Sequence, residues 1–241
     1  MKLYYDFHIH SCLSPCGDND MTPNNLVNMA KLLGLDAIAL TDHNTCGNCA
    51  ATAEVAKQAG LLFLPGMELC TAEEIHVICL FPTVAAAEAF EESLAPFPFV
   101  ENRPEIFGEQ RLCNTKDEIV GCEERLLTVA SSMSIDNVAE AVNAFGGVAF
   151  PAHIDRPSYS ITAALGDIPP LGFTAAELTI TADKEQYLKQ YPLLQTMTLL
   201  TDSDAHYLEN MPESTPYIEI AEATPEAVIA LLKQRSHIRT R

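Results

Sequence analysis

The sequence is poor in basic residues. Lys and Arg number 14 against 33 Asp and Glu, which gives a formal net charge of −19. A surface with this balance repels nucleic acid, because nucleic-acid binding relies on Lys and Arg to displace counterions. It also disfavours phosphorylated substrates unless bound cations invert the local field. We therefore expect no long nucleic acid among the partners of this chain.

Long apolar runs are also missing. Hydrophobic residues make up 48% of the chain, but no run approaches the roughly 20 residues that span a bilayer. The N-terminus lacks the basic-then-apolar pattern of a signal peptide. The sequence thus predicts a cytoplasmic protein with no membrane partner. Its 241 residues, without a dividing linker or repeat, predict a single domain over 1–241 with an irregular excursion at about 95–129. The oligomeric state is left open.

The eight cysteines do not indicate a disulfide framework in a cytosolic chain. Cys12 and Cys16, together with the Cys46-Gly47-Asn48-Cys49 stretch, flank the histidine motifs described below. A Cys-x-x-Cys pair can bind zinc or cycle between redox states. One alternative is therefore a non-catalytic metal-binding or redox-sensing module. It predicts that Cys46→Ser and Cys49→Ser abolish metal binding, whereas His8→Ala does not.

The segment around Asp6-Phe7-His8-Ile9-His10 predicts a metal site close to the start of the chain. Residues 4–9 alternate as a short strand does. Side chains at i and i+2 of a strand point to the same face, so His8 and His10 converge. Two imidazoles about 6–7 Å apart along a strand can clamp a divalent metal.

Strand and helix patterns alternate along the rest of the chain, which predicts parallel strands with covering helices. We expect helices at 23–33, 49–58, 83–94 and 135–145, and strands at 36–40, 61–64, 75–81, 148–150, 176–181, 196–201 and 217–221. Candidate ligands lie at or just beyond strand ends: His43, Glu68, His153, Asp204 and His206, with His76 near a strand start. In a closed parallel barrel such ends share one rim, where active sites assemble.

This candidate set is rich in nitrogen and oxygen donors, which suits Zn²⁺, Mn²⁺ or Fe²⁺ rather than Ca²⁺ or Mg²⁺. It is too large for one ion, so we expect two or three, with a carboxylate such as Glu68 bridging two of them. Clustered cations generate hydroxide near neutral pH and clamp the attacking and leaving oxygens. That chemistry is hydrolytic, and a phosphoester is its most natural substrate.

Five motifs in this order resemble those of the PHP (polymerase and histidinol phosphatase) family: His8-Ile9-His10, Thr41-Asp42-His43, Gly66-Met67-Glu68 with His76 downstream, Pro151-Ala152-His153 and Asp204-Ala205-His206. The resemblance spans nearly the whole chain. It implies an α/β fold, namely a distorted (β/α)7 TIM-like barrel with parallel strands and a metal site at the C-terminal rim. It also implies a trinuclear metal centre and phosphoesterase activity.

The resemblance also implies a division of the ligands. One metal would be held by His8, His10, Glu68 and Asp204, and a second by Glu68, His76 and His153. A third would be held by His43 and His206 with a residue from the loop after His10. The helix start at Thr22-Pro23 selects Asp18 for that place, with Asp20 and Cys16 as alternatives.

Smaller expectations concern catalysis. His206 or Asp204 would help the leaving group take a proton, and Arg156 would either fork onto a phosphate or form a surface ion pair with Asp155. Asp42, which precedes His43, would either orient a metal ligand from behind or cap the next turn. His237, in the basic C-terminal tail, is expected at the surface.

The function predicted from the sequence is that of a metal-dependent phosphoesterase, which hydrolyses a small phosphomonoester through a metal-activated hydroxide. The alternative within phosphoesterases is a nuclease or phosphodiesterase acting on nucleotides. An amidohydrolase-like enzyme would typically need a Lys at a mid-barrel strand end, and none stands there.

Overall fold

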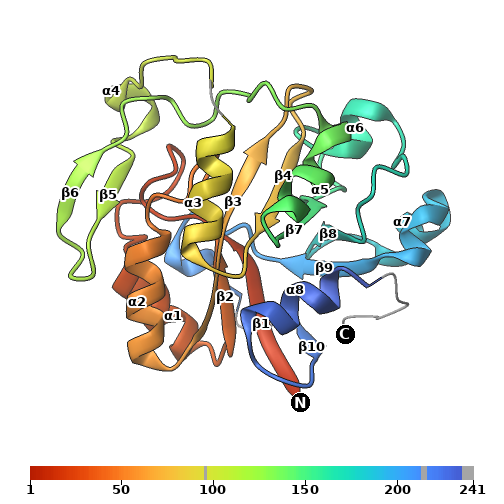
Figure 1. The fold of residues 1–241 in the computed structure, drawn as a ribbon, viewed down its shortest axis with the longest axis horizontal. Coiled ribbons are helices and arrows are strands. Elements are labelled where there is room, and N and C mark those ends of the chain that lie inside the picture. Colours follow the sequence, from red (N-terminus) through yellow and green to blue (C-terminus); the bar gives the residue numbers. More distant parts are fainter. Residues whose placement is uncertain (95–96, 213–215, 235–241) are drawn as a thin grey trace.

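The chain folds as an α/β structure around a curled sheet (Figure 1). The computed structural model describes residues 1–94, 97–212 and 216–234, so His237 lies outside the described residues. The strands are β1 (Lys2–Ile9), β2 (Ala37–Leu40), β3 (Leu62–Cys70), β4 (His76–Leu80), β5 (Arg111–Cys113), β6 (Ile119–Cys122), β7 (Val148–Pro151), β8 (Ala175–Thr179), β9 (Thr198–Asp202) and β10 (Tyr217–Glu219). The helices are α1 (Pro23–Leu32), α2 (Cys49–Ala59), α3 (Val84–Ser93), α4 (Pro104–Phe107), α5 (Ile135–Ala144), α6 (Ile161–Leu165), α7 (Lys184–Gln190) and α8 (Pro225–Leu232), with 3-10 turns η1 (Pro192–Thr196) and η2 (Leu208–Asn210).

The largest sheet has six strands in the order β10-β1-β2-β3-β4-β7, and β8 and β9 form a separate parallel pair. This pair lies between β7 and the end of β1: Ile154 N–H after β7 donates to Glu177 O on β8 (2.9 Å), and Ile9 of β1 bridges to Ala205 after β9. The sheet therefore curls as a distorted barrel does. The expectation of seven parallel strands is wrong in two respects, because the sheet is mixed and its hydrogen-bonded ladder is not continuous.

The departure from parallel order arises at β3 and β4. The expected strand 61–64 continues to Cys70, and segment 71–75 turns back at once, with Thr71 N–H donating to Ile75 O (2.9 Å) and Glu74 at φ 58°. A parallel connection needs a crossover of a dozen or more residues, so this short turn forces an antiparallel hairpin. As a result β4 begins, rather than ends, at the rim, and Cys70 pairs with His76.

A register irregularity in β1 orients the histidine pair. Leu3, Tyr5 and Phe7 belong to one buried cluster with Leu64, Ile78 and Leu200, whereas Ile9 belongs to another with Leu26, Ile38 and Leu40. Side chains two apart on a regular strand share a face, so the strand changes face between Phe7 and Ile9. The pairing of β1 with β2 shifts register at the same place, between Asp6 and Ile9. Local irregularities of this kind re-aim side chains near active sites.

Helices cover the outer face of the sheet, and α8 closes the inner one. The outer cluster includes Leu26 and Val27 of α1 and Val55 of α2, whose starts at residues 23 and 49 match the predicted ones. The inner cluster includes Val228 and Leu232 of α8, which lies beside β1 and β10 in Figure 1. Within the described ranges, no helix has the length and apolar character that crossing a bilayer requires.

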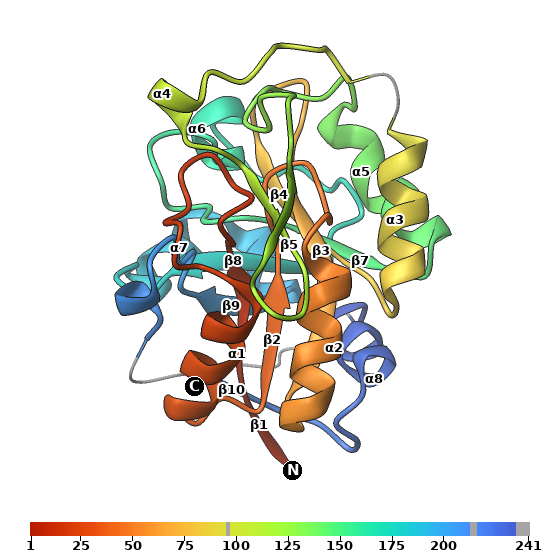
Figure 2. The same ribbon diagram turned by 90° about the vertical axis from the view of Figure 1, so that its left-hand side faces the viewer.

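The excursion after α3 forms α4 and the β5–β6 hairpin, which the sequence patterns do not reveal. Arg111 N–H donates to Cys12 O (2.8 Å) and Cys113 N–H to the Asn48 side chain (2.9 Å), so the hairpin packs on the loop that follows β1 (Figure 2). The returning chain is tied to the rim by Asn44 Nδ2, which donates to Leu127 O (2.7 Å). The excursion therefore flanks the strand ends that carry the histidines.

The close approach of β3 and β4 depends on Gly66. A Cβ at this position would lie 2.5 Å from Cys79 O, which is backbone and cannot turn aside. We expect Gly66→Ala to lower the free energy of unfolding by about 1–3 kcal/mol, measured by urea unfolding. Gly121→Ala in β6 is the matched control, since its nearest neighbour would be Leu112 Cδ1 at 3.7 Å. Equal stabilities of the two variants would show that the hairpin has room to relax.

Candidate metal centre

The Glu68 carboxylate lies at the centre of the candidate site. It is 1% exposed, and a nitrogen of each of five histidines lies within 3.4 Å of one of its oxygens. The nitrogens are those of His76 (2.8 Å), His43 (2.9 Å), His153 (3.1 Å), His8 (3.4 Å) and His10 (3.4 Å). A carboxylate in this position can bridge two metal ions, as the sequence predicts for Glu68.

The second carboxylate of the site is Asp204. Its Oδ1 lies 3.2 Å from His8 Nε2 and 3.1 Å from His10 Nε2, and these two imidazole nitrogens are themselves 3.1 Å apart. Three groups of ligand atoms are spaced closely enough to hold a metal ion: His8, His10, Glu68 and Asp204; His43, Glu68 and His76; and His10, His43 and His206. The second group differs from the ligand set implied by the resemblance, because it contains His43 where that set has His153.

Several polar atoms at this cluster are buried without a hydrogen bond of normal geometry. They are Glu68 Oε2, Asp204 Oδ1, His43 Nδ1 and His153 Nδ1. Buried polar atoms nearly always have a hydrogen-bond partner, so such a concentration needs an explanation. Carboxylate oxygens and imidazole lone pairs are the donors that divalent transition metals bind. The residues therefore fit a cluster of divalent ions.

The electrostatics of the cluster show what these ions would replace. Burial opposes ionisation of Glu68, but His76, His8 and His43 hold its pKa well below the usual value. Burial likewise opposes protonation of His10, but Asp204 and Glu68 raise its pKa to about 9. The pKa of His8 also lies well above its ordinary value, because Glu177, Asp204 and Glu68 outweigh its burial. Without metal, protons on His8 and His10 therefore balance the two carboxylates.

Two other rim histidines, His206 and His43, are held neutral. Burial and the nearby charge of His10 lower the pKa of His206 to about 3, and burial lowers that of His43. Neutral imidazole is the form that binds a metal. Both side chains are therefore in the ligating form at neutral pH.

A second layer of acidic and hydroxyl groups orients the histidines. Glu177 Oε2 lies 2.8 Å from His8 Nδ1, and its Oε1 accepts from His153 N–H (3.0 Å). Asp42 accepts from Ser14 Oγ (2.6 Å), which in turn lies 2.9 Å from His10 Nδ1. A ring nitrogen fixed in this way directs the other one at the metal.

Asp6 is a third acid in this layer. It accepts from the Ser203 hydroxyl (2.6 Å) and so fixes the turn that carries Asp204. Asp42 accepts hydrogen bonds from Ser11 and Ser14. Of the two roles expected for Asp42, its contacts match the orientation of a ligand, because Ser14 links it to His10.

Two of the ligand candidates have backbones in the left-handed region. His153 has φ 29° and Asp204 has φ 51°, and each stands just after a strand. Such conformations cost of order 1–3 kcal/mol in non-glycine residues and persist where the surroundings enforce them, as at functional sites. The backbone N–H of His153 donates to Glu177 Oε1 (3.0 Å). The N–H of Ser203, the residue before Asp204, donates to Asp6 Oδ1 (3.1 Å). The second layer thus also fixes the main chain.

The structure brings together eight of the nine predicted metal ligands: His8, His10, His43, Glu68, His76, His153, Asp204 and His206. The ninth, Asp18, has its carboxylate turned to Asp20 N–H (2.8 Å), while its own N–H donates to His206 O (2.8 Å). Of the alternatives, Asp20 is exposed, whereas Cys16 Sγ lies 3.3 Å from His43 Nε2. Which of these groups bind metal stays a prediction.

Arg156 contacts the cluster rather than Asp155. Its Nη1 lies 2.5 Å from Asp204 Oδ2, and Asp155 instead accepts from Thr179 N–H (2.8 Å). For the alternative module, Cys46 Sγ donates to Glu91 (3.1 Å) and Cys49 Sγ to Gly66 O (3.5 Å). Within the described residues, no group of potential metal ligands contains either cysteine.

Sequence reasoning missed Glu177, Ser14 and Asp6. Glu177 could have been noticed in the sequence, because it interrupts the apolar run Ala175-Ala176-Glu177-Leu178, whose residues are all buried. An acid at such a place needs a partner. Ser14 and Asp6 carry no comparable signal, since a serine in a loop and a single acid within a strand are common.

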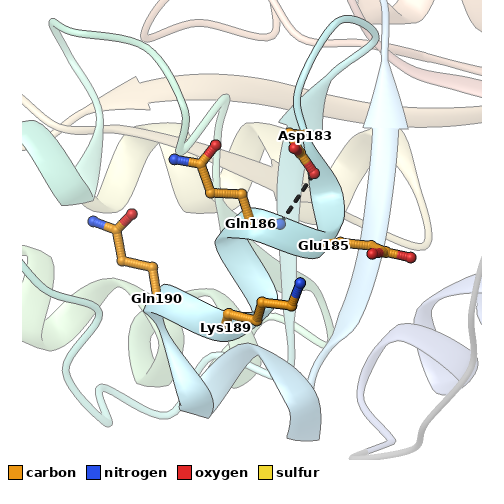
Figure 3. Close-up of a pocket in the computed structure, with 5 residues that line it drawn as sticks. All are labelled: Asp183, Glu185, Gln186, Lys189 and Gln190. Carbon is orange, nitrogen blue, oxygen red and sulfur yellow. Dashed lines mark hydrogen bonds between the residues drawn. The ribbon is translucent and has the colours of Figure 1, made fainter.

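A surface pocket outside the cluster lies on α7. It is lined by Asp183, Glu185, Gln186, Lys189 and Gln190 (Figure 3). Asp183 caps the helix by accepting from Gln186 N–H (3.0 Å). None of these residues reaches the histidines, so the pocket adds no group to the metal centre.

The fold and this cluster agree with the result of a family comparison. The model of the PHP domain matches residues 6–223, and the chain belongs to this family. Among relatives, a 5′-3′ exoribonuclease of Haemophilus influenzae is 34% identical over 83 residues, which is 33% of this chain and 29% of that enzyme. The chain therefore spans less than a third of that relative's length.

Solved structures share the fold at low identity. The lesion-specific endonuclease EndoQ of Pyrococcus furiosus matches with a TM-score of 0.70 at 19% identity, covering 100% of this chain and 58% of that one. A putative metal-dependent phosphoesterase of Bifidobacterium adolescentis matches with a TM-score of 0.58 at 19% identity, covering 84% and 87%. A complex of endonuclease Q with a 27-mer DNA duplex carrying an abasic lesion also has a TM-score of 0.70 at 19% identity, covering 97% and 57%.

These relatives correct the expectation of a small substrate and no long nucleic acid. Both the exoribonuclease and endonuclease Q act on nucleic acid, so nucleic acid cannot be left out of the candidate substrates on net charge alone. The physical reason is that net charge sums over the whole surface, whereas a phosphate meets the local field. Bound divalent ions can make that field positive where Lys and Arg are few.

Metal uptake should release protons. His8 and His10 have raised pKa values, His10 about 9, and are protonated at pH 7, so binding of divalent ions must displace about two protons. Apparent affinity should rise with pH from 7 to about 9, and proton release from His10 should fall as pH passes that value. Titration calorimetry of Zn²⁺ in buffers of different ionisation enthalpy measures this. Metal binding at pH 7 without proton release would contradict the assignment.

Removing the charge of Glu177 should weaken the metal site. Glu177→Gln keeps the size of the side chain but loses the carboxylate behind His8 Nδ1, and such changes cost about 10–100-fold in metal affinity. Competition with a chromogenic chelator measures the difference. The control is Glu54→Gln, since Glu54 is exposed on α2 and contacts Gln58. Equal affinity in the two variants would remove Glu177 from the second layer.

Proposed function

We propose that this chain is a metal-dependent phosphodiesterase that hydrolyses nucleic acid from a strand end. The observation that carries the proposal is the buried carboxylate of Glu68 among five histidines, joined by Asp204 and faced by Arg156. Zn²⁺, Mn²⁺ or Fe²⁺ ions suit these donors; when bound they lower the pKa of water and neutralise phosphate oxygens. The fold, the cluster and the family support hydrolysis of a phosphoester.

Arg156 is suited to bind the phosphate. Its guanidinium is 42% exposed and only one of its nitrogens is bonded to Asp204. Among the described residues, no contact is recorded for its other N–H groups, and the Asp204 carboxylate balances only part of the local positive charge. A guanidinium binds two phosphate oxygens in a fork, which orients the group as well as attracting it. Arg156 thus orients the phosphate at the cluster.

Tyr159 supports a nucleotide as the group next to that phosphate. Its ring stacks on the His76 imidazole, with centroids 4.7 Å apart and planes 26° apart, and the side chain is 49% exposed. The ring is thus held by His76 on one face while much of it stays accessible. An exposed aromatic ring beside a phosphate site stacks a base of any sequence, worth about 1–3 kcal/mol per base.

The negative net charge of the chain supports contact with only a few nucleotides at the end of a nucleic-acid strand. Binding along a duplex needs several Lys and Arg on phosphates, and this chain has 14 such residues against 33 acids. The cluster itself is buried, with Asp204 only 6% exposed. A terminal or unpaired nucleotide reaches such a site with fewer phosphates at the acidic surface. The sequence relative named above, a 5′-3′ exoribonuclease, acts on RNA from an end, as its name states.

Asp204 and His206 serve as ligands in this proposal rather than as acids. Without metal, burial opposes ionisation of Asp204, but the charge of His8 and a hydrogen bond with His10 lower its pKa; as a metal ligand, the carboxylate has no proton to give. His206, with a pKa of about 3, carries no spare proton at neutral pH. The leaving oxygen therefore takes its proton from solvent at the rim.

The test is digestion of end-labelled oligonucleotides by protein stripped with chelator and reloaded with Mn²⁺, Fe²⁺ or Zn²⁺. Single-stranded RNA should be shortened stepwise, and Arg156→Gln should reduce kcat/KM about 10–100-fold, since a bond to a charged group is worth about 1.5–3 kcal/mol. Arg103→Gln, which removes a guanidinium lying over the Phe107 ring, is the matched control and should be unchanged.

The assay should also include a DNA duplex with an abasic site. This duplex is the second candidate substrate, because the chain shares its fold with endonuclease Q. Internal cleavage of that duplex, with RNA untouched, would transfer the proposal to an endonuclease. Failure to cut any oligonucleotide while small phosphate esters are hydrolysed would overturn the nuclease reading.

A further inference from the structure

Arg156 and Tyr159, the two groups that the proposed function assigns to phosphate and base, lie on one turn after β7, residues 154–160. Arg156 is exposed and pairs with Asp204. Tyr159 has φ 55°, in the left-handed region that a non-glycine residue keeps only where its surroundings enforce it. Its O accepts from His76 N–H (2.9 Å), which fixes that side of the turn. The direction of the guanidinium depends on what fixes the other side.

A side chain replaces the main chain in the seam between β7 and β8. These strands belong to different sheets, and Ile154 N–H after β7 donates to Glu177 O on β8 (2.9 Å). In a parallel ladder the next bond would run from Thr179 N–H to Ile154 O. Thr179 N–H instead donates to Asp155 Oδ1 (2.8 Å). The Asp155 carboxylate thus takes the place of a main-chain acceptor between the two strands.

Both oxygens of Asp155 bond the end of β8, because the Thr179 hydroxyl donates to Asp155 Oδ2 (2.5 Å). Ile154 O accepts instead from Thr162 Oγ1 at the start of α6 (2.5 Å). Backbone polar groups away from water need partners, and the Asp155 and Thr162 side chains supply them where the chain leaves the strand. The next residue is Arg156, which therefore starts from a fixed point on the rim.

The main chain of Arg156 is bonded within the turn. Its N–H donates to His153 O (2.9 Å), and its O accepts from the buried Ser160 hydroxyl (2.6 Å). Pro157 follows Arg156 in the chain and disfavours the helical region for it. The turn is thus a closed unit, and Asp155 attaches this unit to β8 beside the residue that carries the guanidinium.

We propose that Asp155, bonded to Thr179 on β8, is a positioning residue for Arg156 and sets how accurately the guanidinium meets the phosphate. The inference rests on the proposed function, which gives Arg156 its phosphate. A guanidinium fork needs both of its N–H groups aligned with the phosphate oxygens, and a misplacement of about 1 Å can cost about 100-fold in rate. Asp155 acts through Arg156 alone, so its removal should cost no more than the removal of Arg156.

The experiment is a double-mutant cycle in the whole chain reloaded with Mn²⁺, with end-labelled single-stranded RNA as substrate. Asp155→Ala should lower kcat/KM about tenfold. In the Arg156→Gln background the same change should alter kcat/KM by less than about twofold, because the two residues act as one unit. Asp155→Asn should restore most of the activity, since its amide accepts from Thr179 N–H and donates to the Thr179 hydroxyl. The affinity for Zn²⁺, measured by chelator competition, should stay unchanged.

Two further pairs of variants complete the design. Thr179→Val removes the hydroxyl that bonds Asp155 and should lower kcat/KM, whereas Thr179→Ser keeps the hydroxyl and should not. Asp183→Ala is the matched control, because Asp183 also accepts from a backbone N–H, that of Gln186 (3.0 Å), but on α7 away from the histidines. Where far-ultraviolet circular dichroism shows that Asp155→Ala does not fold, the Thr179 pair decides the outcome.

Unchanged kcat/KM in Asp155→Ala, a loss that multiplies with that of Arg156→Gln, or weaker Zn²⁺ binding would overturn the inference and leave the nuclease proposal standing. An Asp155→Asn variant as inactive as Asp155→Ala would overturn it too. Failure of the wild type to cut RNA would overturn the nuclease proposal instead, and the same cycle would then be measured on the small phosphate ester that the protein hydrolyses. Absence of any hydrolysis would overturn both.

Discussion

The structure depends on keeping one carboxylate ionised in the interior. Glu68 is 1% exposed, and a buried charge without partners is strongly unfavourable. Here the charge is balanced by histidines from β1, β4 and the segments after β2 and β7, all of which meet at one carboxylate. Protons on His8 and His10 or divalent ions can supply that balance. The same residues thus hold the sheet together at its rim and create a place for metal.

Two irregularities of the sheet make this convergence possible. The β3–β4 hairpin places His76 at the start of an antiparallel strand, beside Glu68, although a parallel strand would carry it to the opposite end. The register shift in β1 separates the apolar residues Tyr5 and Phe7 from the histidine pair that follows. A regular parallel barrel built from the same residues would not place both groups correctly.

The sequence predicted most of the site, because donors at strand ends need only the strand order to be brought together. It could not predict the β3–β4 hairpin, because the residues between the two strands do not distinguish a hairpin turn from a loop that leads to a parallel strand. It also misjudged nucleic acid, because a net charge of −19 describes the surface and not the site. The side chains that orient the histidines, such as Glu177, come from strands far away in the chain and are found only in the folded structure.

The hydrogen bond from Phe7 N–H to Asp202 joins residues 195 positions apart, and β1 is paired on one side by β10. At a translation rate of 5–20 residues per second, His8 and His10 leave the ribosome roughly 10–40 s before the Asp204 segment exists. The strand that carries the histidine pair can meet β2 early, because residues 37–40 follow it closely in the chain. Asp204 and His206 join the site last, so the complete cluster exists only once nearly the whole chain has been made.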